Sequence, residues 1–205
     1  MAGIVTHIAL SDKVFKNNFS NFNLEEFVLG TSFADIRYLG VIDRNKTHYK
    51  NISMQAIKES NNSFTAGLMF HSLVDEVREN YIRSHEIYNK LPRSDYVSQA
   101  MKFCEDIDIY SECSNWGKYT DYFDSFSVSE ENYGIRKKDL LEWHKIVQQA
   151  IISKPNLQVV KQIVLKFTLS PEAVDEILSV AKKIQENVLA GYIHDFYGQF
   201  GELCK

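Results

Sequence analysis

The sequence predicts an all-α protein, a single-domain multi-helix bundle that spans residues 1–205, and three observations support this. Glycine (9 residues) and proline (3 residues) are scarce, whereas turn-dense β structure needs many of both. Apolar residues recur at three- and four-residue spacing in most segments, which is the helical period. The length suits one domain with a substantial core, and neither an internal repeat nor a linker divides the chain.

The first 60 residues are predicted to form two helices and a loop. Residues 4–16 carry apolar side chains at intervals consistent with a short helix. Asn23, followed by Leu-Glu-Glu, is a suitable N-cap for a second helix over residues 23–36. Residues 37–60 contain Gly40 and several asparagines, which predicts a loop with short turns.

The middle of the chain is predicted to contain one long helix, one shorter helix and a long loop. The long helix covers residues 62–91, and Pro92 is expected to end it because proline lacks the amide hydrogen of the helical ladder. Residues 95–109 form a second amphipathic segment. Residues 110–134 are rich in Tyr, Ser, Asp and Asn and are predicted to be a long loop, a feature that is often functional in compact domains.

The C-terminal part is predicted to be helical as well. A helix is expected over residues 136–153, and the apolar segment 157–168 is either a short helix or a strand. Ser170 and Pro171 match an N-cap followed by proline at the first helical position. The helix that they begin is expected to run to about residue 198.

Composition excludes several classes of protein. Apolar residues (44%) and charged residues (24%) are in the proportions of a globular protein, so disorder is not expected. The net charge of -4 argues against nucleic acid as a partner, because phosphate binding usually needs a basic face. The three cysteines form no Cys-x-x-Cys pair, so no cysteine-based zinc site is predicted. No signal peptide and no transmembrane segment is recognised, so a cytoplasmic location is expected, with non-classical export as an alternative.

A candidate metal site begins with His71 and Asp75. An i, i+4 pair on a helix projects both side chains from the same face. Imidazole and carboxylate are ligands for zinc and also for other divalent metals. Apolar residues 66–70 precede the pair, and Leu73 and Val74 lie inside it, so a charged group here needs a partner. The pair is therefore predicted to bind a metal; the alternative is a surface or capping interaction.

Three further segments match this pair. Thr6-His7 lies in the first predicted helix, Asp35 ends the run Gly-Thr-Ser-Phe-Ala-Asp that starts at Gly30, and Thr47-His48 lies in the following loop. The order of these pieces resembles the zinc-dependent phospholipase C family, which is related to fungal zinc-dependent single-strand nucleases. The resemblance covers roughly residues 3–82, and the fold that it implies is all-helical.

The resemblance implies specific roles. Asp35, His48, His71 and Asp75 would hold one zinc ion, and Asp75 would bridge to a second ion that His7 also holds. Asp35 would double as the base toward a metal-activated water, the arrangement suited to phosphoester hydrolysis. The implied substrate is a small phosphoester, such as a phospholipid head group or a nucleotide.

The sequence departs from the family pattern in two ways. No tryptophan stands near the N-terminus, where large members use one as a metal ligand. The family also has a later His-x-x-x-Glu, whereas His85 is followed by Asn89 and His144 by Gln148. We therefore expect an incomplete set of metals.

Other readings stay open at this stage. The first hypothesis is a metal-dependent phosphoesterase, and the second is a non-catalytic metal-binding or structural interaction protein with a degenerate site. A third is a protein without metal whose histidines are buried and hydrogen-bonded.

The doublet His194-Asp195 resembles the motif of HD-type phosphohydrolases, but no aspartate follows it, so His194 is expected at the surface or core edge. The basic loop residues either steer a phosphate or are solvated charges; they are Arg37, Arg44 and Lys46.

Overall fold

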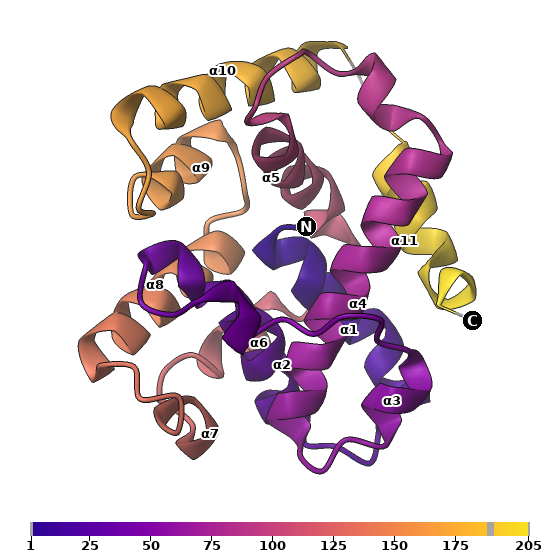
Figure 1. The fold of residues 1–205 in the computed structure, drawn as a ribbon, viewed down its shortest axis with the longest axis vertical. Coiled ribbons are helices and arrows are strands. Elements are labelled where there is room, and N and C mark those ends of the chain that lie inside the picture. The colour runs from indigo at the N-terminus through magenta and orange to yellow at the C-terminus, as the bar shows by residue number, and fades with distance from the viewer. Residues whose placement is uncertain (1, 188–190, 205) are drawn as a thin grey trace.

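The computed structural model describes residues 2–187 and 191–204. Within these ranges the chain forms α-helices joined by short 3-10 helices, without a β-strand, which confirms the all-α prediction (Figure 1). No helix in the same ranges is long and apolar enough to cross a bilayer. The elements are α1 Ile4–Asn18, α2 Leu24–Phe33, η1 Ala34–Leu39, η2 Arg44–Lys46, α3 Met54–Lys58, α4 Ser63–Ser84, η3 Ile87–Lys90, α5 Val97–Ile109, η4 Tyr110–Glu112, α6 Trp116–Asp121, α7 Val128–Glu131, α8 Lys137–Ile152, α9 Leu157–Val164, α10 Pro171–Asn187 and α11 Tyr192–Leu203.

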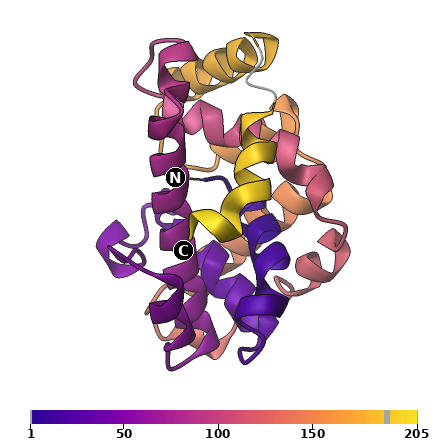
Figure 2. The ribbon, with the colours of Figure 1, turned by 90° about the vertical axis from the view of Figure 1, so that its right-hand side faces the viewer.

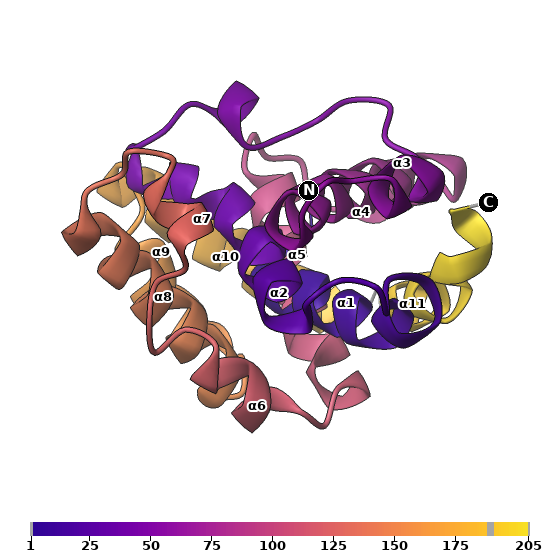
Figure 3. The ribbon, with the colours of Figure 1, turned by 90° about the horizontal axis from the view of Figure 1, so that it is seen from below.

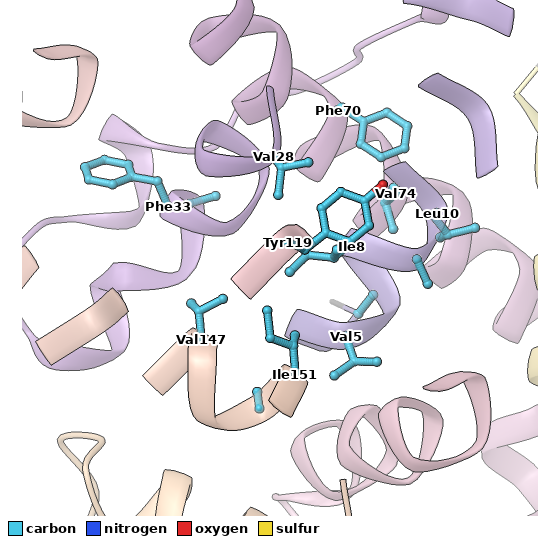
Figure 4. Packing of buried hydrophobic residues seen from close by; sticks show 14 of the residues in the cluster. Val5, Ile8, Leu10, Val28, Phe33, Phe70, Val74, Tyr119, Val147 and Ile151 are labelled. Atoms are coloured by element: carbon cyan, nitrogen blue, oxygen red, sulfur yellow. The ribbon is translucent and has the colours of Figure 1, made fainter. Parts of the chain in front are cut away.

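The main hydrophobic core surrounds α1. Figure 4 shows Val5 and Ile8 of α1 close to Val147 and Ile151 of α8, and all four side chains are fully buried. α1 also contacts α2 and α5, while α11 lies beside α4 and contacts it (Figure 2). A smaller buried cluster joins the end of α4 to α5 and α10. Because α1 and α4 share this core, their polar residues can be held at fixed positions inside the bundle.

Helices α2 and α4 pack with their backbones in direct contact. A Cβ atom at Gly30 would lie 2.1 Å from the carbonyl oxygen of Phe64. A Cβ atom at Gly67 would lie 2.1 Å from the carbonyl oxygen of Phe27. Glycine at both positions therefore allows the approach, which brings the end of α2 and the start of η1 against α4.

The predicted helix over residues 23–36 is too long. α2 ends at Phe33, and the chain continues as the tighter 3-10 helix η1, which ends at Gly40 in the left-handed conformation (φ 69°). Residues 37–60 contain η2 and α3 within the predicted loop. Figure 3 shows this segment arching across one side of the bundle before it reaches α3.

The long helix predicted over residues 62–91 ends earlier than expected. α4 stops at Ser84, and Glu86 has a left-handed backbone (φ 53°), which an α-helix cannot continue through. The 3-10 helix η3 then leads to Pro92, so the proline does not end the helix.

The predicted long loop over residues 110–134 is wrong in large part, because η4, α6 and α7 lie within it. A capping box between Ser127 and Glu130 starts α7. Buried aromatic side chains, Trp116 and Tyr119 among them, fix the segment to the core. Segment 157–168 resolves to a helix, α9, capped by the side chain of Asn156.

The last predicted helix, from Ser170 to about residue 198, is two helices. Its start is correct, because α10 begins at Pro171. Gly191 has φ 117°, a conformation that interrupts an α-helix, and α11 begins after it. Residues 188–190 of the predicted helix lie outside the described residues.

Candidate metal centre

The five predicted ligands come together from four segments of the chain. His7 lies on α1, Asp35 on η1, His48 just after η2, and His71 and Asp75 on α4. Nε2 of His71 lies 3.7 Å from Oδ2 of Asp75 and 4.0 Å from Oδ1 of Asp35. Nε2 of His48 lies 3.9 Å from the same Oδ2 of Asp75. Four side chains between positions 35 and 75 therefore meet at one point, and His7 lies beside them.

Two of the histidine ring nitrogens at this point make no hydrogen bond to a described residue. Nε2 of His48 and Nε2 of His71 are both buried without a hydrogen-bond partner among the described residues. Buried polar atoms are nearly always satisfied, so two such atoms facing the same carboxylates need an explanation. Donors bound to one zinc ion at 2.0–2.1 Å are about 3.3 Å apart in a tetrahedral shell. The observed spacings of 3.7 to 4.0 Å exceed this by under 1 Å, so small side-chain shifts would fit the ion.

The hydrogen bonds of the opposite ring nitrogens fix the tautomer of both histidines. Nδ1–H of His71 donates to the carbonyl oxygen of Thr31 at 2.9 Å. The hydroxyl of Thr47 donates to the carbonyl oxygen of Ala34 at 3.0 Å, so its oxygen can accept from Nδ1–H of His48, also at 3.0 Å. With the proton on Nδ1, each Nε2 carries a lone pair toward the carboxylates, as a metal ligand requires.

The electrostatics keep the histidines neutral and the carboxylates charged. Burial lowers the pKa of His48 to about 4 and that of His71 to about 3. Burial alone would raise the pKa of Asp35, but nearby cations, Lys102 first, hold it below its ordinary value. The pKa of Asp75 is also held well below its ordinary value, although burial opposes this, and His71 contributes most to the lowering. Near neutral pH the site therefore offers two neutral imidazoles and two carboxylates, a suitable donor set for a divalent cation.

His7 occupies a different position from the other two histidines. Its ring stacks on that of His71, with centroids 3.8 Å apart and 3° between the planes. Its Nδ1–H donates to the carbonyl oxygen of Gly3, and its Nε2 lies 3.5 Å from Oδ1 of Asp75. The same Oδ1 accepts a hydrogen bond from the amide of Ala2 at 2.8 Å.

Two overlapping groups of ligand atoms result. In one, atoms of Asp35, His48 and His71 lie within 4.8 Å of one another; in the other, atoms of His7, His71 and Asp75 do. His71 belongs to both groups but has a single available nitrogen, so one imidazole cannot serve two ions through it. The group around Asp35, which also has Asp75 within reach, is the better candidate for one ion. The second ion held by His7 stays a prediction.

Basic residues also approach Asp35, and one of them reaches the same oxygen that His71 faces. Nη2 of Arg37 lies 3.3 Å from Oδ1 of Asp35. Lys102 of α5 is buried, and its Nζ donates to the hydroxyl of Tyr38, as does Nη2 of Arg37. Sequence reasoning missed Lys102, although a lysine between Met101 and Phe103 in an apolar helix face is a signal that such a residue has a buried partner.

The centre opens to solvent beside Asp75. A pocket of ≈ 410 Å³ lies there, whereas Asp35 and His71 are covered by the surrounding helices. The pocket is lined by Arg44, Tyr49, Lys50, Asn51, Ser72, Asp75, Glu76, Glu79 and Arg83. A small molecule can therefore approach the ligand cluster from the side of Asp75.

The remaining candidate histidines have other partners. Nδ1 of His85 bonds to the carbonyl oxygen of Tyr81, in the same turn. His144 is buried between the carbonyl oxygen of Phe123 and the carboxylate of Glu130, at 3.0 and 2.7 Å. His194 lies at the surface and contacts Glu112, as expected from the sequence. Among the described residues, none of the three belongs to a group of potential metal ligands.

The contact between Thr47 and His48 predicts the effect of one substitution. In Thr47→Val the hydroxyl that accepts from Nδ1–H of His48 is lost, so the ring is no longer oriented. We expect zinc affinity to fall by about 10- to 100-fold, the usual effect of losing an outer-shell partner. Competitive titration against a fluorescent zinc chelator measures it. Thr120→Val is the control, because its hydroxyl bonds only to its own helix, at the carbonyl of Trp116. Equal zinc affinity in wild type and Thr47→Val would contradict this role.

Comparison of the chain with protein-family models, curated proteins and solved structures found no match in any of the three. The resemblance to the zinc-dependent phospholipase C family therefore rests on the residues of the motifs and on nothing wider. The structure itself shows a buried His–Asp cluster with a pocket beside Asp75.

Proposed function

We propose that this protein binds one zinc ion through Asp35, His48, His71 and Asp75 and hydrolyses phosphoesters. The observation that supports it is the convergence of two buried imidazole nitrogens, without hydrogen bonds, on two ionised carboxylates. When bound, the ion would supply a Lewis acid and an activated water, which phosphoester hydrolysis requires.

The surrounding residues assign a role to each ligand. Thr31 and Thr47 hold the two imidazoles in the tautomer that leaves Nε2 available. Asp35 is the proposed base, because Lys102 and Arg37 keep its buried carboxylate ionised and able to accept a proton. Asp75 is the one of the four proposed ligands that lines the described pocket, so a substrate there would meet this ligand first.

One feature favours a second function, a structural zinc site. Four protein ligands fill a tetrahedral shell, as they do in structural zinc sites, whereas catalytic sites keep a position open for water. In that case the ion would fasten η1 and the segment after η2 onto α4 and add to the stability of the fold. The catalytic proposal requires a fifth position, on the pocket side of Asp75.

The test of the proposed function compares stripped and reloaded protein. Wild-type protein is treated with a chelator, dialysed and reloaded with zinc, and is then assayed on phosphomonoesters and phosphodiesters at each step. Turnover is expected to disappear on stripping and return with zinc. Asp35→Asn is expected to lose at least 100-fold of the activity, since it removes both a ligand charge and the base. Stoichiometric zinc without turnover on a broad phosphoester panel would favour the structural site. The absence of zinc binding would overturn both functions.

Zinc is also expected to raise the thermal stability of the protein. A ligand at 100 times its dissociation constant adds about 2.7 kcal/mol, which corresponds to roughly 5–10 °C in Tm for a chain of this length. Differential scanning fluorimetry of stripped protein, with and without zinc, measures the shift. Magnesium is the matched control, because it prefers oxygen ligands in an octahedral shell and should shift Tm far less. An unchanged Tm in saturating zinc would contradict the site.

A further inference from the structure

We propose that Arg44 binds the phosphate group of the substrate, and that the pocket beside Asp75 accepts phosphoesters of small, hydrophilic alcohols. The proposal rests on the proposed function and deepens it, because it names the residue and the substrate class at the open side of the same site.

Arg44 is tied to the ligand cluster by its backbone. Its carbonyl oxygen accepts the amide hydrogens of Thr47 and His48, at 3.1 and 3.0 Å. The turn that presents His48 to the cluster is therefore the same turn that carries Arg44. Its guanidinium reaches back over the site, with Nη2 3.9 Å from Oδ2 of Asp75.

The guanidinium of Arg44 has donors available. At 3.9 Å from Asp75 it is beyond hydrogen-bond distance, and the side chain is 53% exposed. The structure records no hydrogen bond from this guanidinium within residues 2–187 and 191–204. A planar group with five donors at the rim of a metal site matches the oxygens of a phosphate, which it can bind in a bidentate manner.

The other basic loop residues are placed differently. Arg37 is largely buried and is engaged with Asp35 and the hydroxyl of Tyr38. Lys46 is exposed and does not line the pocket beside Asp75. Of Arg37, Arg44 and Lys46, Arg44 is therefore the one whose guanidinium both has hydrogen-bond donors available and lines the pocket beside Asp75.

The walls of the pocket point to a hydrophilic substrate. Tyr49 is the single aromatic residue among those lining it, and no aliphatic side chain contributes. Arg83 forms an ion pair with Glu79 at 2.6 Å, which leaves Lys50, Asp75 and Glu76 as the charged lining groups besides Arg44. The apolar surface here comes from the ring of Tyr49 and the stems of charged side chains, so an alkyl chain would have no continuous apolar wall to pack against, whereas hydroxyl groups would find donors and acceptors. The volume of ≈ 410 Å³ suits a phosphate with a few further atoms.

The test measures phosphate binding, independently of turnover. Zinc affinity is first determined for wild type, Arg44→Gln, Arg44→Lys and Lys46→Gln, and all four are expected to agree within about threefold. Each zinc-loaded protein is then titrated with inorganic phosphate by isothermal calorimetry. We expect Arg44→Gln to bind phosphate at least about tenfold more weakly than wild type, Arg44→Lys to be intermediate, and Lys46→Gln to match wild type.

Equal phosphate affinity in wild type and Arg44→Gln, with zinc bound in both, would overturn the assignment of Arg44 and leave the zinc site intact. The absence of zinc binding in wild type would instead overturn the proposed function, and this proposal with it.

The substrate class has its own arm of the experiment. Zinc-loaded wild type is titrated with glycerol 3-phosphate and with hexyl phosphate. Glycerol 3-phosphate is expected to bind at least as well as inorganic phosphate, and the hexyl chain is expected to add nothing. Binding of hexyl phosphate tenfold tighter than that of inorganic phosphate would show an apolar subsite and overturn the hydrophilic class.

Discussion

His71→Ala is expected to abolish zinc binding at the site and, with it, any zinc-dependent phosphoesterase activity. His71 is the ligand common to both groups of potential metal-binding atoms, and its Nε2 faces both Asp35 and Asp75. A four-ligand zinc site carries about 10–16 kcal/mol in total, so loss of one ligand should weaken binding by at least 100-fold. Equilibrium dialysis against buffered zinc, followed by metal analysis, measures the change.

The control for this substitution is His194→Ala. His194 is exposed and contacts Glu112 on the surface, so its removal is expected to leave zinc affinity and stability unchanged. Far-UV circular dichroism establishes that His71→Ala keeps its helices. Wild-type zinc affinity in a folded His71→Ala protein would contradict the proposed ligand set.

Gly67→Ala is expected to have the largest effect on stability. Its Cβ would lie 2.1 Å from the carbonyl oxygen of Phe27 and 2.8 Å from the amide nitrogen of Thr31. Both are backbone atoms of α2, so no side-chain rotation relieves the contact and the two helices must separate. We expect a loss of about 3 kcal/mol or more in the free energy of unfolding, at the upper end for overpacking. Chemical denaturation followed by circular dichroism measures it.

The same substitution is expected to weaken zinc binding, because α2 leads directly into η1 and so positions Asp35 relative to α4. Gly201→Ala is the matched control. It lies within α11, and a Cβ there would meet no atom within 4 Å. Alanine should leave stability equal or raise it by about 0.5–1 kcal/mol, because it lowers the entropy of the unfolded chain. A Gly67→Ala protein as stable as wild type would contradict the close packing of α2 and α4.

Local patterns in the sequence predicted the parts of the molecule that depend on local physics. The i, i+4 spacing of His71 and Asp75 places both side chains on one face of a helix, and the structure confirms that this segment is helical. The N-cap at Asn23 and the start of α10 at Pro171 follow from the chemistry of those residues alone. Local patterns do not predict that His71 and Asp35 lie 4.0 Å apart, because this distance depends on how α2 packs on α4. Their proximity was predicted only from the order of the motifs along the chain.

Features that depend on long-range contacts could not be predicted in this way. The end of α4 at Ser84 has no proline or glycine to mark it, since Glu86 adopts the left-handed conformation instead. The helices within residues 110–134 are short and are held by burial of aromatic residues rather than by their own helical period. Lys102 reaches the site from α5, and the residues next to it in the sequence do not indicate that Tyr38 is its hydrogen-bond partner.

The central claim is that four side chains from three segments converge to bind one cation. Anomalous diffraction at the zinc absorption edge, from crystals grown in saturating zinc, tests it most directly. We predict a peak bonded to Nε2 of both His48 and His71 and to the carboxylates of Asp35 and Asp75. A map without a peak among these four residues, or with zinc bound at another place while they remain unbonded, would contradict the claim.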